Sequence, residues 1–347
     1  MSFTVAGTYP PYSINSNVKT ISITCIGGGG AVGSFNNQTY GFGGNGGQVS
    51  SIFNFSPGQN AFNLTIIVGG GGKIYNGDPA LGCGGGGGGM TQVFNNDGSI
   101  LVIAGGGGGG STNELDIDGG DGGGNNVNYG SNSNISICYA GGGGITNGSG
   151  GIAGGCSGPA SGTPGIAYTF NSGGNGGNGY SFGSGIGVGG YNGGGNGGDV
   201  GFFGNGGGGA GYGGGGGGGS NGPNRIESTG GGGGGSFSNG VNIVYSVSNN
   251  GGGGQLFSED GGDGSVTIGV EYYNNSNICI PVCPPRPIPK PGVAFGGTMN
   301  IVGFENTQAY KYSVLVNIPN NGRSTIINTP LNQYGYKLPP PPPRNIF

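Results

Sequence analysis

The chain has 347 residues, of which 100 are glycine and only 6% are charged, and its formal net charge is −4. Globular proteins average about 7% glycine and about 25% charged residues, so this is not an ordinary globular sequence. The nine Lys and Arg residues are scattered along the chain, which argues against a basic surface that binds nucleic acid. There is no histidine, which removes the commonest general base and metal ligand.

The sequence also carries no pattern typical of membrane insertion or export. No stretch approaches the roughly 20 apolar residues of a membrane span. The amino-terminal residues lack the basic and apolar regions of a classical signal peptide. We therefore expect no membrane span.

Short runs of apolar and β-branched residues, bounded by turn residues, predict β-strands. In chain order these runs cover residues 18–26, 48–55, 61–68, 90–94, 99–104, 242–248 and 265–273. The turn Asn95-Asn96-Asp97-Gly98 separates two of them and predicts a β-hairpin. The pattern predicts an all-β fold, an antiparallel β-sandwich.

Several of these predicted strands lead directly into glycine tracts, as in SILVIAGGGGGG at residues 99–110. The long middle, residues 105–240, repeats glycine with a period of three, for example in GGNGGNG at 173–179 and GGGNGGD at 193–199. Polyproline-II-type helices have three residues per turn, and glycine lets such helices approach closely enough to exchange hydrogen bonds. We therefore expect an inserted bundle of polyglycine II helices, and flexible glycine linkers are the alternative.

Several segments together resemble a known family. They are SFTV at 2–5, VKTISITCIGGGG at 18–30, GGNGGQVSSIFNFSPGQ at 43–59, LTIIVGGGG at 64–72, GGGGGGMTQVFNNDGSILVIAGGGGGG at 84–110 and GGDGSVTIGVEYY at 261–273. This order is similar to the glycine-rich domain of phage, bacterial and large-virus surface proteins. It is also similar to the glycine-rich region of anaplastic lymphoma kinase receptors and, loosely, to T-even phage tail-tip adhesins. The resemblance implies a β-sandwich with bundled polyglycine helices.

Two kinds of polar residue invite a chemical interpretation. The motif DGGDG occurs at 118–122 and again at 260–264, and oxygen ligands on a loop can hold calcium. Asp-Gly pairs are more often turns, so we predict no metal and no cofactor. The six cysteines allow 15 pairings, and we expect thiols or partial pairing. No catalytic constellation is recognisable, so we expect no enzyme.

Aromatic side chains in the glycine-rich middle are the candidate contacts for a ligand or partner. They are Tyr180, Phe182, Tyr191, Phe202, Phe203 and Tyr212. Rings displayed on a rigid backbone suit sugar faces or protein hot spots. The alternative is structural: the rings fill the edges of the bundle or contact a neighbouring copy.

The composition changes after residue 273, and we expect four regions. They are a glycine-rich domain at 1–273, a proline-rich linker at 274–292, a small β-rich attachment arm at 293–338 and an extended proline-rich tail at 339–347. The tail is of the kind that docks in a groove of a neighbour.

The sequence therefore predicts a non-enzymatic structural protein of a virus particle surface, capsid-associated or part of a fibre, that forms a homo-oligomer or is present in repeated copies. The arm would bind other particle proteins. One alternative is an adhesin that recognises a host glycan or surface protein. Another is a secreted ice-binding or surface-binding protein, which would be extracellular rather than on the virion.

Overall fold

The computed structural model describes most of the first 273 residues and two strands beyond them. The described residues are 1–35, 38–74, 82–112, 117–123, 138–144, 147–156, 161–167, 174–179, 187–199, 204–220, 227–248, 253, 260–273, 312–317 and 325–330. The chain divides into two compact units, Met1–Asn275 and Ser276–Phe347.

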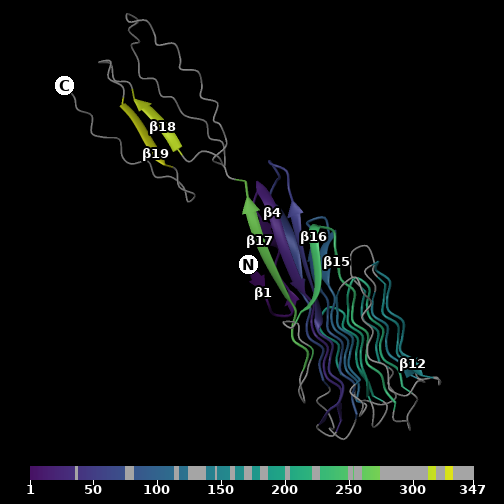
Figure 1. Ribbon diagram of the computed structural model, residues 1–347. Coiled ribbons are helices and arrows are strands. Elements are labelled where there is room, and N and C mark those ends of the chain that lie inside the picture. The colour runs from purple at the N-terminus through teal and green to yellow at the C-terminus, as the bar shows by residue number, and fades with distance from the viewer. Residues whose placement is uncertain are drawn as a thin grey trace, which may run out of the picture. The chain divides into compact units, whose positions relative to one another are not determined.

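The described part of the first unit is all-β and contains two antiparallel sheets (Figure 1). The five-stranded sheet has the order β1 (Ser2–Phe3), β17 (Ser265–Tyr272), β4 (Val18–Ile26), β7 (Gly46–Asn54) and β16 (Val241–Ser248). The six-stranded sheet has the order β15 (Phe237–Ser238), β10 (Ile100–Ala104), β9 (Thr91–Phe94), β8 (Phe62–Val68) and β2 (Gly7–Thr8), with β3 (Tyr12–Ile14) also paired to β8. All-β architecture is thus confirmed, and β9 and β10 form the predicted hairpin.

Three further pairs of short strands lie outside the two sheets. They are β5 (Ser34–Phe35) with β6 (Gln38–Thr39), β11 (Cys138–Tyr139) with β12 (Gly155–Cys156), and β13 (Gly198–Asp199) with β14 (Gly204–Asn205). In the second unit, β18 (Tyr312–Asn317) pairs with β19 (Thr325–Pro330) in an antiparallel register. These two strands fall within the predicted attachment arm, and the rest of the arm, the linker and the tail lie outside the described residues.

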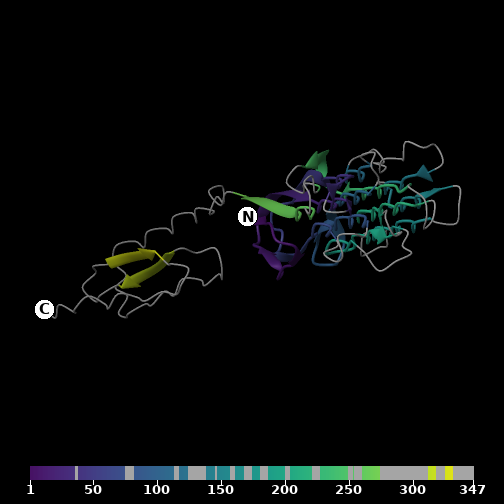
Figure 2. The same cartoon turned by 90° about the horizontal axis from the view of Figure 1, so that it is seen from below.

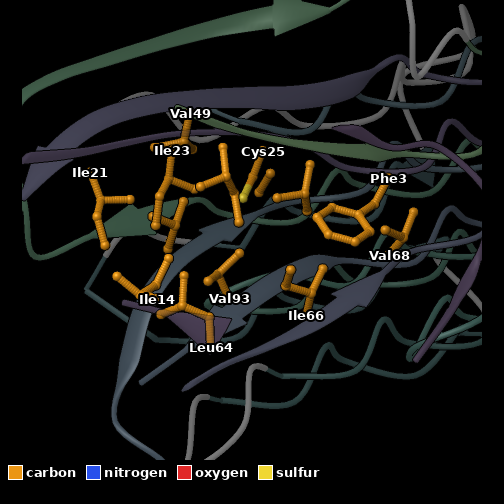
Figure 3. Packing of buried hydrophobic residues seen from close by; sticks show 14 of the residues in the cluster. Phe3, Ile14, Ile21, Ile23, Cys25, Val49, Leu64, Ile66, Val68 and Val93 are labelled. Atoms are coloured by element: carbon orange, nitrogen blue, oxygen red, sulfur yellow. The ribbon is translucent and has the colours of Figure 1, made fainter. Parts of the chain in front are cut away.

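The two sheets share one hydrophobic core, in a sandwich-like arrangement (Figure 3). In β4 the side chains of Ile21, Ile23 and Cys25 are buried, whereas Ser22 and Thr24 between them are exposed and partly exposed, respectively. This alternation follows from the period of two in a β-strand, which turns successive side chains to opposite faces. The buried side chains of the other sheet that complete the core include Leu64, Ile66, Val68, Val93 and Val102.

The strand β16 differs from the core strands although its sequence is equally apolar. It forms an edge of the five-stranded sheet and pairs with β7. Val241, Ile243, Val244 and Val247 are all exposed on it. Sequence composition alone did not distinguish this edge strand from the interior ones.

The glycine-rich segments lie side by side and extend from the sheets as a stack of parallel and antiparallel rows (Figures 1 and 2). We call them the glycine array. Its segments are 27–33, 41–47, 69–72, 84–89, 105–112, 117–123, 140–144, 150–155, 161–167, 174–179, 187–199, 204–220, 227–236 and 260–264. Strands β4, β8 and β10 each continue directly into one of these segments.

The segment 105–112 shows how the array is connected, because the backbone N–H groups of residues 106–112 donate to three different neighbours in turn. The bonds are Gly106 to Ala210, Gly109 to Gly207 and Thr112 to Gly204; Gly107 to Gly28 and Gly110 to Ala31; and Gly108 to Gly120 and Ser111 to Ile117. Each neighbour is therefore contacted once every three residues.

The carbonyl groups of the same segment accept hydrogen bonds from three other neighbours. The bonds are Gly47 to Gly105, Gly44 to Gly108 and Gly41 to Ser111; Gly234 to Gly106 and Gly231 to Gly109; and Gly88 to Gly107 and Gly85 to Gly110. The segment is thus surrounded by six others, and its residues are buried. Backbone groups, rather than side chains, hold this part of the molecule together.

Close approach explains why glycine is required here. A Cβ atom built on Gly108 would lie far inside the 3.0 Å limit of real Cβ contacts, against the carbonyl oxygen of Gly231. The backbone angle φ is not the reason, because the described glycines with positive φ, such as Gly58 and Gly98, lie mainly in turns outside the array. Glycine serves the array by having no side chain.

Candidate functional site

Only two of the six predicted aromatic contacts belong to the part of the chain that the structure describes. They are Tyr191 and Tyr212. Tyr180, Phe182, Phe202 and Phe203 lie outside the described residues. The structure places the two described rings in different environments.

Tyr191 is an exposed ring held on a turn of the array. Its side chain is 51% exposed, and its hydroxyl lies 2.9 Å from the hydroxyl of Thr8. The turn is fixed by Asn192, whose side-chain amide donates to the carbonyl of Met90 over 2.8 Å. The backbone of Asn192 is left-handed, with a φ of 68°. Asparagine tolerates this left-handed conformation better than most residues. The ring is therefore both accessible and anchored at its hydroxyl end.

Tyr212 is a packed ring at the junction between the array and the six-stranded sheet. It stacks on Phe237, with ring centroids 4.3 Å apart and an interplanar angle of 14°. Both rings pack against a buried cluster formed by Met90, Phe94, Ile100, Ile103 and Ala210. A packed ring of this kind is what the structural alternative of the sequence analysis describes, in which the aromatic rings fill the edges of the glycine-rich bundle.

The first acidic motif uses its carboxylates to bind backbone N–H groups of the neighbouring segment. Asp118 accepts a hydrogen bond from the N–H of Phe42 over 2.8 Å, and Asp121 accepts one from the N–H of Asn45 over 2.7 Å. Donors and acceptors are both spaced by three residues. The side-chain oxygens thus occupy the place that the carbonyl groups of another glycine segment would take.

The second acidic motif works in the same way. Asp263 accepts from the N–H of Gly71 with one oxygen over 3.0 Å and from the N–H of Ala6 with the other over 3.1 Å. Asp260 accepts from the N–H of Ile74 over 3.0 Å and forms an exposed ion pair with Lys73 over 3.1 Å. The repeated spacing of DGGDG therefore follows the three-residue period of the array.

Asparagine and threonine side chains continue this pattern across three segments, 161–167, 174–179 and 187–199, the last of which turns back at residues 191–193. The Oγ1 of Thr163 accepts from the N–H of Asn178 over 2.6 Å, and the Oδ1 of Asn178 accepts from the N–H of Asn196 over 2.8 Å. The Oδ1 of Asn196 in turn accepts from the N–H of Gly189 over 2.9 Å. Asn178 of the motif GNGGNG thus has the same structural role as the aspartates of DGGDG, which the sequence reasoning did not recognise.

Among the described residues, no group of three or more His, Cys, Asp or Glu side chains lies together as metal ligands would. The carboxylates considered for calcium bind backbone N–H groups instead. The exposed pair Lys19–Glu271, 2.7 Å apart, lies on the sheets, where the hydrogen bond from Lys19 lowers the pKa of Glu271.

Replacing Asp263 by alanine is expected to destabilise the first unit by about 1 to 3 kcal/mol, because two backbone donors lose their acceptor. Asp263→Asn keeps one acceptor oxygen and should cost clearly less. Urea unfolding followed by circular dichroism measures both. Equal effects of the two variants would show that the hydrogen bonds of this carboxylate do not support the array.

A comparison with protein-family models finds no match, and a search of curated proteins finds none either. In the part of the chain that the structure describes, no helix has the length and apolar character needed to cross a membrane.

Proposed function

We propose that the segments of the glycine array are polyglycine II helices packed as a bundle. The support is the period of three, since the N–H groups of residues 106–112 return to the same neighbour at every third residue. A helix with three residues per turn and no internal hydrogen bonds presents its donors in this way. Slow hydrogen exchange of the amides of Gly105–Gly110 is expected; exchange at free-peptide rates would instead indicate flexible linkers.

We further propose that the chain is a non-enzymatic structural protein of a virus particle surface, capsid-associated or part of a fibre. The observation that carries this proposal is the array itself, whose interior consists of hydrogen-bonded backbone and few side chains that could perform chemistry. An array of this kind suits a structural role. The resemblance to glycine-rich surface proteins points in the same direction and makes membership of that family part of the proposal.

Contacts with other particle proteins are assigned to the arm at 293–338 and the tail at 339–347. A second contact between copies is consistent with β16, which pairs only with β7 among the described strands and carries exposed Val241, Ile243, Val244 and Val247. Exposed apolar edge strands promote association unless something covers them. In a particle with repeated copies, a neighbouring copy would cover this edge.

Immunogold electron microscopy with an antibody against residues 292–347 tests the particle assignment. Regular decoration of a capsid or appendage is the expected result. Label found only in free secreted material would reject the particle assignment and leave a soluble binding protein.

The exposed ring of Tyr191 favours one second candidate, an adhesin that recognises a host glycan or surface protein. In this case Tyr191→Ala should weaken binding to a panel of immobilised glycans by about 10-fold or more. Tyr191→Phe keeps the ring and loses only the hydroxyl contact with Thr8, so it should retain most of the binding. Absence of glycan binding by the unmodified protein would remove the glycan form of this candidate, and thermal hysteresis would instead favour an ice-binding protein.

A further inference from the structure

The register of the β11–β12 pair places two cysteines opposite each other. Cys138 pairs with Cys156, and Tyr139 pairs with Gly155. Directly opposed residues in antiparallel strands have Cα atoms about 4.5 to 5.5 Å apart. Disulfides usually join Cα atoms about 4.4 to 6.8 Å apart. A hydrogen-bonded pair and a non-hydrogen-bonded pair of opposed residues both meet this distance requirement.

The strand pair is fixed on both sides by the glycine array. The N–H of Gly141 donates to Gly230, and the N–H of Gly154 donates to Gly217. The hydroxyl end of Tyr139 also lies against Gly155, where a Cβ would come within 3.0 Å of the tyrosine oxygen. A side chain at position 155 would therefore disturb the contact with Tyr139. The register that opposes the two cysteines is thus supported by independent contacts.

The other described cysteines have no such arrangement. Cys25 and Cys83 are buried thiols. Cys25 belongs to the core between the two sheets, where burial raises the pKa of its thiol. Its register partners in β7 and β17 are Val49 and Val266.

We propose that Cys138 and Cys156 form a disulfide that fastens segments 140–144 and 150–155 to each other. The bond forms by exchange with a disulfide-bonded donor: the two thiols lose two protons and two electrons, an S–S bond forms, and the donor is reduced to two thiols. It closes a loop at the end of the array remote from the sheets, where β12 lies in Figure 1. This proposal is independent of the proposed function, since it concerns the maturation of the array.

The direct test is peptide mapping of the full chain after incubation with oxidised glutathione. Unreacted thiols are first alkylated under denaturing conditions, and the protein is then digested without reductant. The expected product joins the peptides that contain Cys138 and Cys156. Alkylation of both cysteines, or their linkage to other cysteines, would overturn the proposal.

A thermal measurement provides a second readout. In oxidised protein, Cys138→Ser, Cys156→Ser and the double variant should each lower Tm by the same amount, roughly 5 °C or more. After full reduction, the three variants and the unmodified chain should melt within a narrow range. Unequal losses for the two single variants in oxidised protein, or equal losses with and without reductant, would contradict a shared disulfide.

Discussion

Replacing Gly108 by alanine is expected to destabilise the first unit by about 3 kcal/mol or more. The added Cβ would collide with the carbonyl oxygen of Gly231, which is backbone and cannot rotate away. Separating the two segments would also strain the hydrogen bonds of Gly108 with Gly120 and Gly44, each 2.8 Å long. Thermal and urea unfolding followed by far-UV circular dichroism measure the loss.

The matched control is Gly269→Ala in β17. Gly269 is exposed, and the added Cβ would meet only the side chain of Ser22, which can rotate to another position. We expect a change within about 1 kcal/mol, as for most surface substitutions. If both glycine variants unfolded at the same urea concentration, close packing in the array would not be the reason for glycine at position 108.

The second large effect is expected for Ile23→Ala, which should cost about 2 to 5 kcal/mol. Ile23 lies in β4, its side chain is fully buried in the core between the sheets, and its removal leaves a cavity (Figure 3). The preceding residue provides the control, because Ser22 faces solvent and Ser22→Ala should change the stability little. Equilibrium unfolding in urea compares the two. A small effect of Ile23→Ala would mean that the sheets do not pack through this face.

The sheets could be predicted from the sequence because their side chains carry the information. The alternation from Val18 to Ile26 and the turn at residues 95–98 predict a strand and a hairpin, and the structure contains both. The boundaries shift by one or two residues, as in β7, which begins at Gly46 rather than Gln48. The exposed position of β16 could not be predicted, because an apolar edge strand and an apolar interior strand have the same composition.

The partners within the glycine array could not be predicted, because one run of glycine is like another. Residues 206–209 and 231–234 are all glycine, so no side chain within these stretches distinguishes them as neighbours of Gly105–Gly110. The neighbours are instead fixed by the strands that lead into each segment and by side chains such as Asp121 and Asn178, which bind particular backbone N–H groups.

In the candidate site, too, some features could be predicted from the sequence and others could not. Tyr191 and Tyr212 both stand next to glycine in the sequence, yet one ring is exposed and the other stacks on Phe237. The stacking partner is distant in the sequence, so no local pattern could reveal it. The role of the acidic motifs could have been predicted, because the three-residue spacing of the aspartates in DGGDG matches the period of the surrounding glycines.

The period of three has an evolutionary consequence for the length of each glycine segment. In the polyglycine II helix that we propose for segment 105–112, deleting one residue would turn all following donors by about 120° and direct each toward the wrong neighbour. Deleting three residues would restore the directions and shorten the segment by one turn. Natural variants of this chain should therefore gain and lose residues in these segments in multiples of three, much as coding sequence preserves its reading frame.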